Sequence, residues 1–144
     1  MTKQFTNNEQ IFVDTSGFKA VIDPNDEFHL KAVKIWEKLK KQKVILVTSN
    51  YVLDETFTLL RARCGIKAAL RFKESLAKSS RVIKIVRITL ADEADAWYWF
   101  IKSWSKLSFT DCVSFALMKR LGIKKVVAFD RHFVRAGIDV ITNL

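Results

Sequence analysis

The stretch IFVDTSGF, residues 11–18, takes an apolar run directly into a carboxylate and then into small polar residues. Residues 10–13, QIFV, have the composition of a short buried strand, and Asp14 follows them at once. Parallel strands are covered on both faces and are apolar along their whole length, as here and in VILV, residues 44–47. The stretch therefore predicts a strand of a parallel sheet that carries an acid at its carboxyl end.

Helical patterns separate the predicted strands along the chain. We expect strands at residues 10–13, 44–47, 81–88, 125–129 and 139–142, and helices at residues 26–43, 51–63, 66–78, 89–104 and 108–122. Strands that alternate with helices form βαβ units, so the sequence predicts an α/β fold with a mostly parallel sheet.

The length of 144 residues suits one domain, which we place at residues 10–144 behind a polar tail of residues 1–9. The chain starts without the apolar segment of a signal peptide, and no apolar run reaches the roughly 18 residues that a membrane span needs. The two cysteines, Cys64 and Cys112, match no zinc-binding spacing. We therefore expect a cytoplasmic protein in a reducing environment, with no membrane partner.

Two acids directly follow predicted strands. Asp14 follows the strand at residues 10–13, and Asp130 follows the strand at residues 125–129. The carboxyl ends of parallel strands meet at one edge of the sheet, which is where open α/β sheets bind ligands. Taken singly, each acid is better explained as the N-cap of a following helix, so neither one alone defines a site.

Glu55 falls on an apolar helix face. In the helix at residues 51–63 it shares that face with Val52 and Leu59, whereas Asp54 lies on a polar face. We expect Glu55 to point inward, where an unpaired carboxylate is costly unless a cation lies nearby. The alternative is a position at the rim of the core, with the carboxylate reaching water.

Asp111 has two interpretations. With Ser108 it forms a capping box at the start of the helix at residues 108–122. The same helix precedes the strand that ends at Asp130, so its N-terminus could also lie at the edge of the sheet. If the acids converge, they need a cation between them, and carboxylate oxygens suit Mg²⁺ or Mn²⁺, which promote phosphodiester hydrolysis.

Three stretches, FVDTSGF, YVLDETFTLL and LSFTDCVSFALMKRLGIKKVVAFDRHF, resemble the PIN-domain ribonucleases, in particular the VapC-type toxins of toxin–antitoxin pairs. The resemblance extends from about Ile11 to Ile141. It implies a three-layer α/β/α sandwich around the parallel sheet, and a catalytic Mg²⁺ or Mn²⁺ site. The family's acidic positions correspond to Asp14, Glu55, Asp111 and Asp130, with the small polar residues Ser16 and Thr110 beside them.

His132 departs from the family pattern. Some members of the family carry a further carboxylate two residues after the last of the acids, where this sequence has His132. The departure counts against a fully ligated second metal ion. We consider two roles for this side chain: contact with a phosphate or leaving group, or plain packing in a loop beside Phe133.

The chain is strongly basic, with a formal net charge of +10, which favours a polyanionic partner such as RNA. Residues 61–87 hold nine basic residues and a single acid, Glu74. The predicted RNA-binding residues in this segment are Arg61, Arg63, Lys67, Arg71 and Lys73. The alternative is a solvated helix face, which is also our interpretation of the lysines at residues 31–43.

An apolar stripe at helical spacing predicts a core face or a dimer interface. It consists of Leu90, Ala94, Trp97, Ile101 and Trp104, while Tyr98 and Trp99 leave the stripe and are candidates for exposed contacts. VapC-type proteins commonly dimerise and bind a small antitoxin, so the resemblance implies a homodimer and an antitoxin partner.

The main hypothesis is a metal-dependent endoribonuclease that is the toxin of such a pair. One alternative is a PIN-like module that binds RNA or an assembly partner without cutting. Another is an RNA-processing nuclease outside any toxin system. A third alternative is a receiver-type α/β domain, which requires paired acids after its first strand and a lysine after a late strand. The stretches VDTS and AFDR do not contain these residues.

Overall fold

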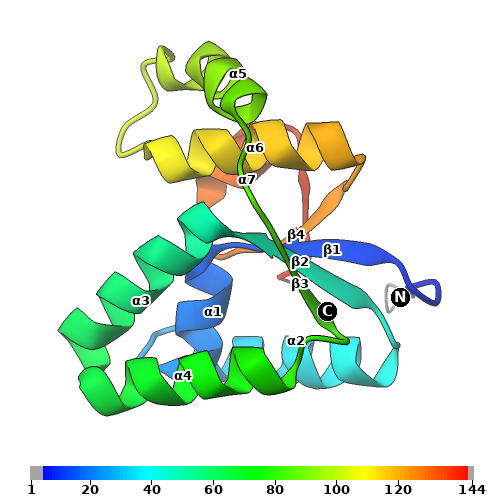
Figure 1. Ribbon diagram of the computed structural model, residues 1–144, viewed down its shortest axis with the longest axis vertical. Helices are drawn as coiled ribbons and strands as arrows, with labels where there is room; N and C mark the ends of the chain where they lie inside the picture. The colour runs from blue at the N-terminus through cyan, green and yellow to red at the C-terminus, as the bar shows by residue number, and fades with distance from the viewer. Residues whose placement is uncertain (1–4, 143–144) are drawn as a thin grey trace.

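The computed structural model describes residues 5–142 as an α/β protein with a five-stranded sheet in which every pairing is parallel (Figure 1). The strand order is β3-β2-β1-β4-β5. The strands are β1 (Gln10–Val13), β2 (Ile45–Ser49), β3 (Ile83–Val86), β4 (Lys125–Val127) and β5 (Asp139–Val140). All five predicted strands are thus present, each close to its expected position.

Helices cover the two faces of the sheet, so the predicted three-layer α/β/α arrangement is confirmed (Figure 1). One layer consists of α1 (Thr15–Ile22), α2 (His29–Lys41), α3 (Asn50–Cys64) and α4 (Ile66–Lys78). The other consists of α5 (Leu90–Phe100), α6 (Phe109–Leu121) and α7 (Arg131–Arg135).

The strand order reverses between the central strand, β1, and its neighbour β4. From β1 the chain proceeds to β2 and β3 in one direction, and then returns to add β4 and β5 in the other. Such a switch point opens a crevice at the carboxyl ends of the two strands. Asp14 and Asp130 follow these two strands, so the topology brings them to the same crevice.

Capping residues fix the helix ends that flank this edge. Ser49 accepts a hydrogen bond from the amide of Val52 at the start of α3, and Gly65 ends α3 with a φ of 93°. Ser108 and Asp111 form the expected capping box of α6, which ends at Gly122 in a left-handed conformation. The limits of these helices were therefore predictable from single residues.

The two shortest helices were not predicted. The predicted helices include none directly after Asp14 or Asp130, although each acid is a candidate N-cap; in the structure α1 and α7 begin there, with these aspartates as N-caps. Elsewhere the expected limits were too wide: the helix at residues 26–43 begins only at His29, because Asp26 folds into a turn by accepting the amide of Phe28. The helix at residues 89–104 ends at Phe100.

The expected N-terminal tail packs against the domain over its described part. Phe5 is buried in the core, and Glu9 forms an ion pair with Lys125 at 2.9 Å. Of the polar tail predicted at residues 1–9, Phe5 and Glu9 therefore contact the domain. Residues 1–4 of the tail and residues 143–144 of the predicted domain lie outside the described residues.

Most of the predicted apolar stripe is exposed, but Trp104, which lies beyond the end of α5, packs against the core. Leu90 is 85% exposed, Ile101 77% and Trp97 53%. Trp99, which we expected to be exposed, packs against the core, while Tyr98 is exposed as expected. Across the described residues no helix is long and apolar enough to cross a membrane.

Gly17 allows α1 to lie against β4. A Cβ atom on Gly17 would come within 2.5 Å of the carbonyl oxygen of Val127, and the amide of Asp14 already donates to that oxygen. We expect Gly17→Ala to lower the free energy of unfolding by about 1–3 kcal/mol, because the helix must move away from the strand. Urea unfolding followed by circular dichroism measures this change, and an unaltered midpoint would show that the contact is not rigid.

Candidate active site

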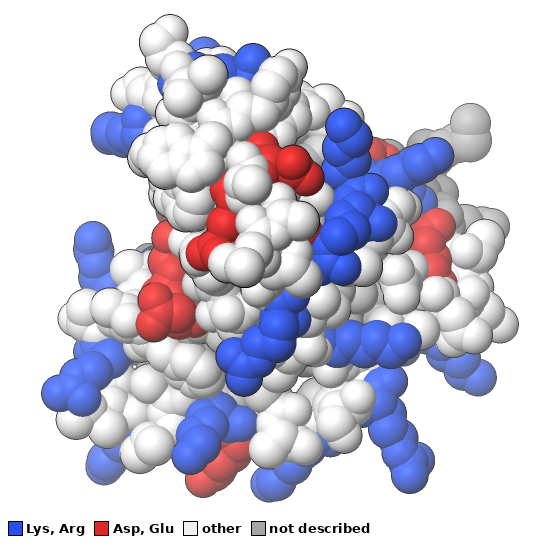
Figure 2. Space-filling view, turned by 45° about the horizontal axis from the view of Figure 1, so that its top comes forward, with Lys and Arg blue, Asp and Glu red and all other residues white. Residues whose placement is uncertain are grey.

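The predicted acids meet in one pocket at the carboxyl edge of the sheet. A hollow of about 330 Å³ is lined by Asp14, Glu55, Asp111 and Asp130, which come from four separate elements or their caps. Figure 2 shows acidic side chains gathered in the middle of one face, with Lys and Arg side chains around them. The fold therefore brings together residues that are up to 116 positions apart in the chain.

Asp14 is buried at the end of β1. Its Oδ2 accepts hydrogen bonds from the hydroxyl of Ser16 at 2.9 Å and from the amide of Ser16 at 3.3 Å. Its Oδ1 is buried and has no hydrogen-bond partner in the described chain. Burial raises the pKa of Asp14 to about 6, opposed by the hydrogen bonds from Ser16 and assisted by the charge of Glu55.

Asp111 is buried in the first turn of α6. Its amide donates to Ser108 Oγ at 3.0 Å, and its Oδ2 accepts the amide of Ser108 at 3.4 Å. Burial, followed by the charges of Asp14, Asp130 and Glu55, raises its pKa to about 8. Asp111 is both a capping residue and a member of the pocket, so its two interpretations are not exclusive.

Glu55 points into the pocket, as its helical face predicts. The side chain is half-buried and lines the hollow together with Leu59, whereas Asp54 is exposed to solvent. The charge of Glu55 contributes to the raised pKa of Asp14 and of Asp111. The inward face of α3 therefore adds a carboxylate to an already acidic site.

Asp130 closes the far side of the pocket. Its Oδ1 accepts the amide of His132 at 2.7 Å, which caps α7, and its side chain is 31% exposed. The His132 ring is buried, with Nε2 3.9 Å from the same oxygen and the ring stacked on Trp104. His132 is thus packed, which agrees with one of its two predicted roles. It does not line the pocket itself, but one of its ring nitrogens lies within 4.8 Å of a carboxylate oxygen of Asp111 and of Asp130.

Of the two auxiliary polar residues, Ser16 lies at the pocket and Thr110 does not. Ser16 lines the pocket, donates to Asp14, and accepts the amide of Phe129 at 2.9 Å, so its hydroxyl joins the ends of β1 and β4. Thr110 does not line the described pocket; its carbonyl accepts the Ser114 hydroxyl at 2.8 Å. The hydroxyl-bearing residue that α6 brings to the hollow is its N-cap, Ser108.

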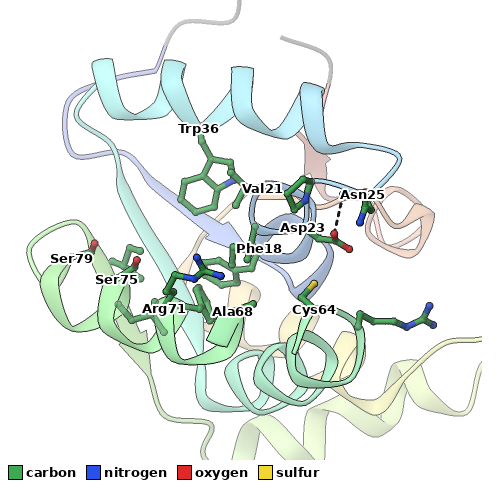
Figure 3. Close-up of a pocket in the computed structure, with 16 residues that line it drawn as sticks. Phe18, Val21, Asp23, Asn25, Trp36, Cys64, Ala68, Arg71, Ser75 and Ser79 are labelled. Atoms are coloured by element: carbon green, nitrogen blue, oxygen red, sulfur yellow. Dashed lines mark hydrogen bonds between the residues drawn. The ribbon is translucent and has the colours of Figure 1, made fainter. Parts of the chain in front are cut away.

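The predicted RNA-binding residues lie apart from the acids. Arg61, Arg63, Lys67, Arg71 and Lys73 are all exposed on α3 and α4. Arg63 and Arg71 line a second, larger groove of about 740 Å³, which Trp36 enters from the opposite side (Figure 3). None of the five lines the acidic pocket.

Sequence reasoning missed two lysines that line the pocket. Lys19 Nζ lies 2.7 Å from Asp26 and 3.2 Å from Asp23, and these contacts raise the pKa of Lys19. Lys106 lines the opposite side, has a φ of 61°, and forms no ion pair in the described chain. Lys19 could be predicted as a pocket residue only if α1 had been predicted, because Lys19 lies one turn into that helix.

The donor set fits a hard divalent cation. The four side chains offer only oxygen atoms, and Lys19, which also lines the pocket, is paired with other acids. Burial is the main cause of the raised pKa values of Asp14 and Asp111, and the charges of neighbouring acids add to it; a divalent cation would favour the ionised form of both carboxylates. The unpartnered Oδ1 of Asp14 is a ligand atom that no protein group already uses.

Fold and site together define a class of α/β protein with a carboxylate site at the switch point of a parallel sheet. The sequence model of the PIN domain matches residues 11–139, and the chain belongs to the PIN-domain family. A relative in Mycobacterium tuberculosis, the 23S rRNA-specific endonuclease VapC20, is 38% identical over 128 residues, which cover 88% of this chain and 94% of the relative.

Solved structures agree with the family. The crystal structure of Mycobacterium tuberculosis VapC20, described as a Sarcin-Ricin loop cleaving toxin, has a TM-score of 0.78 at 36% identity and covers 89% of this chain and 95% of its own. FitAcB from Neisseria gonorrhoeae has a TM-score of 0.63 at 18% identity, over 90% of this chain and 95% of its own, and shows the shared fold. The predicted family and the predicted fold are therefore confirmed.

Proposed function

We propose that this protein is an endoribonuclease of the VapC type that hydrolyses RNA phosphodiester bonds with a divalent cation, Mg²⁺ or Mn²⁺. The convergence of four carboxylates at the sheet edge is the observation that carries the proposal. The similarity to a 23S rRNA-specific endonuclease over 88% of the chain supports the choice of RNA as the substrate. A module that only binds RNA would not need a costly acidic cluster.

The roles of the four acids follow from their surroundings. Asp14, Glu55, Asp111 and Asp130 would hold the cation, with Asp14 Oδ1 free to bind it and Ser16 fixing the position of Oδ2. When bound, the cation supplies an activated water and stabilises charge that develops on the phosphoryl group. Asp111 is held by its capping box and Asp130 by the amide of His132, so the rigid starts of two helices orient both carboxylates.

The proposed substrate is the large ribosomal RNA. This extension rests on VapC20, which is described as cleaving the sarcin–ricin loop of 23S rRNA. We propose that the protein acts in the cytoplasm as the toxin of a toxin–antitoxin pair, because ribosomes are found there and because the resemblance is to such toxins. An RNA-processing nuclease would use the same acids on a precursor RNA.

Mapping of RNA ends tests the substrate. Purified protein is incubated with intact bacterial ribosomes and Mg²⁺, and new ends in 23S rRNA are located by primer extension. We expect one major cut within the sarcin–ricin loop. Cuts only in precursor RNA would favour a processing nuclease, and RNA that is bound but uncut with either metal would favour a binding module.

Two surfaces support the proposed protein partners. The exposed side chains of Leu90, Trp97 and Ile101 on α5 would be covered in a homodimer. The groove beside Trp36 is mainly apolar, carries Arg63 and Arg71, and contains a buried indole nitrogen of Trp36 without a hydrogen-bond partner in the described chain. An apolar antitoxin segment with acidic residues would suit that groove.

The basic surface of α3 and α4 is expected to bind the RNA backbone. Replacing Arg61 and Lys67 with Gln should weaken RNA binding and reduce the slope of log affinity against log salt by about 1 to 2, because two phosphate contacts are lost. Both residues are exposed and neither lines a pocket, so the fold and the groove are left intact.

The matched control for this double variant is a double variant on α2. Lys31→Gln with Lys34→Gln removes the same charge from exposed positions on that helix. Filter binding of each protein to an rRNA fragment at several salt concentrations gives the slopes. Equal slopes for the two double variants would indicate that the charge acts without a preferred surface.

A further inference from the structure

We propose that His132 is a nitrogen ligand of the cation site and that it makes the site prefer Mn²⁺ and other transition-metal ions to Mg²⁺. The inference rests on the proposed metal site, and it assigns to it a ligand that carboxylates alone do not provide. It is carried by the position of the ring, by its burial, and by a buried ring nitrogen, Nδ1, that has no hydrogen-bond partner in the described chain.

The imidazole faces the acids. One ligand atom from each of Asp111, Asp130 and His132 can be chosen so that all lie within 4.8 Å of one another. His132 Nε2 is 3.9 Å from Asp130 Oδ1, which is too long for a hydrogen bond. Two ligands that each lie about 2.1 Å from one ion are at most about 4.2 Å apart, so this pair already has a separation that one ion can bridge.

The ring is buried without a partner for its nitrogens. His132 is 4% exposed, and its Nδ1 is buried and unpartnered in the described chain. Leaving a buried polar atom unpaired costs on the order of 1–3 kcal/mol, so a side chain kept in this position needs a compensating interaction. A cation bound to Nδ1 would provide that interaction.

Packing fixes the orientation of the ring. The imidazole stacks on the indole of Trp104, with centroids 6.3 Å apart and planes only 7° from parallel. The amide of His132 donates to Asp130 Oδ1 at 2.7 Å, so the backbone that carries the ring is tied to one of the acids. The ring is thus oriented by its faces and its backbone, which leaves its nitrogen edge available to a ligand.

Ligand chemistry predicts the metal preference. Mg²⁺ favours oxygen ligands and retains several waters, whereas imidazole binds first-row transition metals well. A site with carboxylates alone distinguishes these ions poorly. Adding one imidazole strengthens the binding of transition-metal ions more than that of Mg²⁺ and so separates their affinities.

Pulsed electron paramagnetic resonance on the Mn²⁺-loaded protein tests the inference, because electron spin echo modulation detects a ¹⁴N nucleus bound to Mn²⁺. The chain has only two histidines, and the other, His29, hydrogen-bonds the carbonyl of Ala20 through Nδ1 at 2.8 Å. The test variant is His132→Phe, which keeps a flat ring against Trp104. The matched control is His29→Phe.

We expect ¹⁴N modulation in the wild type and in His29→Phe, and its loss in His132→Phe. The same variant should weaken Mn²⁺ binding about tenfold or more in calorimetry while changing Mg²⁺ binding much less. His132→Asp should restore binding without modulation and with a smaller preference for Mn²⁺. A wild type that binds Mn²⁺ without ¹⁴N modulation would overturn this inference alone, whereas a wild type that binds neither ion would overturn the proposed metal site itself.

Discussion

Glu55→Gln is expected to reduce the rate of RNA cleavage by at least about 100-fold while the fold remains intact. The amide keeps the size of the side chain and its place beside Leu59 in the pocket, but it removes one of the negative charges that would hold the cation. Because the acids act together on one ion, the loss should appear mainly in the rate constant at saturating RNA. Single-turnover cleavage of a labelled rRNA fragment measures it.

The neighbouring acid on α3 is the matched control. Asp54 precedes Glu55 in sequence but is exposed on the polar face of the helix. Asp54→Asn makes the same chemical change and should leave the rate within about twofold of wild type, as surface substitutions usually do. If both variants lose activity equally, the inward direction of Glu55 is not what matters. If Glu55→Gln keeps full activity, the proposed site is wrong.

A divalent cation is expected to stabilise the protein much more at about pH 8 than at about pH 5. In the folded chain the pKa of Asp111 is raised to about 8 and that of Asp14 to about 6, above the usual value of 3.8. The cation favours the ionised carboxylates, which the folded protein without metal disfavours. We expect excess Mn²⁺ to raise the melting temperature at pH 8 by roughly 5–10 °C.

The direction in which stability changes with pH follows from proton binding. Between about pH 4 and pH 8 the folded state holds protons on Asp111 and Asp14 that the unfolded state has released, so stability without metal falls as the pH rises. The contribution of each group is fully present below its unfolded pKa and is lost as the pH passes through its folded pKa. Acidic buffer should therefore stabilise the metal-free protein, and metal should compensate for the loss in basic buffer.

The matched variant for this pH effect is Asp111→Asn. Without metal at pH 8 it should melt at a higher temperature than the wild type, because a buried carboxylate no longer has to ionise. It should also lose most of the stabilisation by Mn²⁺. Thermal scans with and without chelator at the two pH values measure both effects. An equal metal response at pH 5 and pH 8 would contradict the raised pKa values.

Much of the fold could be predicted because single residues mark its elements. Apolar runs located the strands, and caps such as Ser108 and Gly122 located the ends of α6. The short helices α1 and α7 were missed because each begins at an acid that follows its strand directly or after two apolar residues, with no polar loop between them. At such a junction one aspartate both caps a helix and lines the pocket, and the local sequence alone does not show that it has both roles.

The site was predictable where helical periodicity orients a side chain and not where tertiary packing does. The face shared with Val52 and Leu59 predicted that Glu55 points inward, and the structure places it in the pocket. Nothing local indicated that Thr110 would miss the hollow or that Lys106 would line it, because both depend on how the loop before α6 crosses the sheet edge.

Exposure of the aromatic residues on α5 also depends on packing. Helical spacing grouped the exposed Leu90 and Ile101 with Trp104, which packs against the core, because periodicity does not say whether a residue meets the core or solvent. Asp92 on the other side of α5 is buried in an ion pair with Arg120 of α6, at 2.7 Å, and this contact turns Trp97 outward and leaves Trp99 against the core.

The most direct test of the account is cleavage of ribosomal RNA by metal-stripped protein to which single cations are returned. We predict no cleavage in chelator, recovery with Mg²⁺ or Mn²⁺, and no recovery with either ion when Asp14 is replaced by Asn. Cleavage that continues in chelator at the wild-type rate, or that survives Asp14→Asn with either ion, would contradict a catalytic cation held by the carboxylates at the sheet edge.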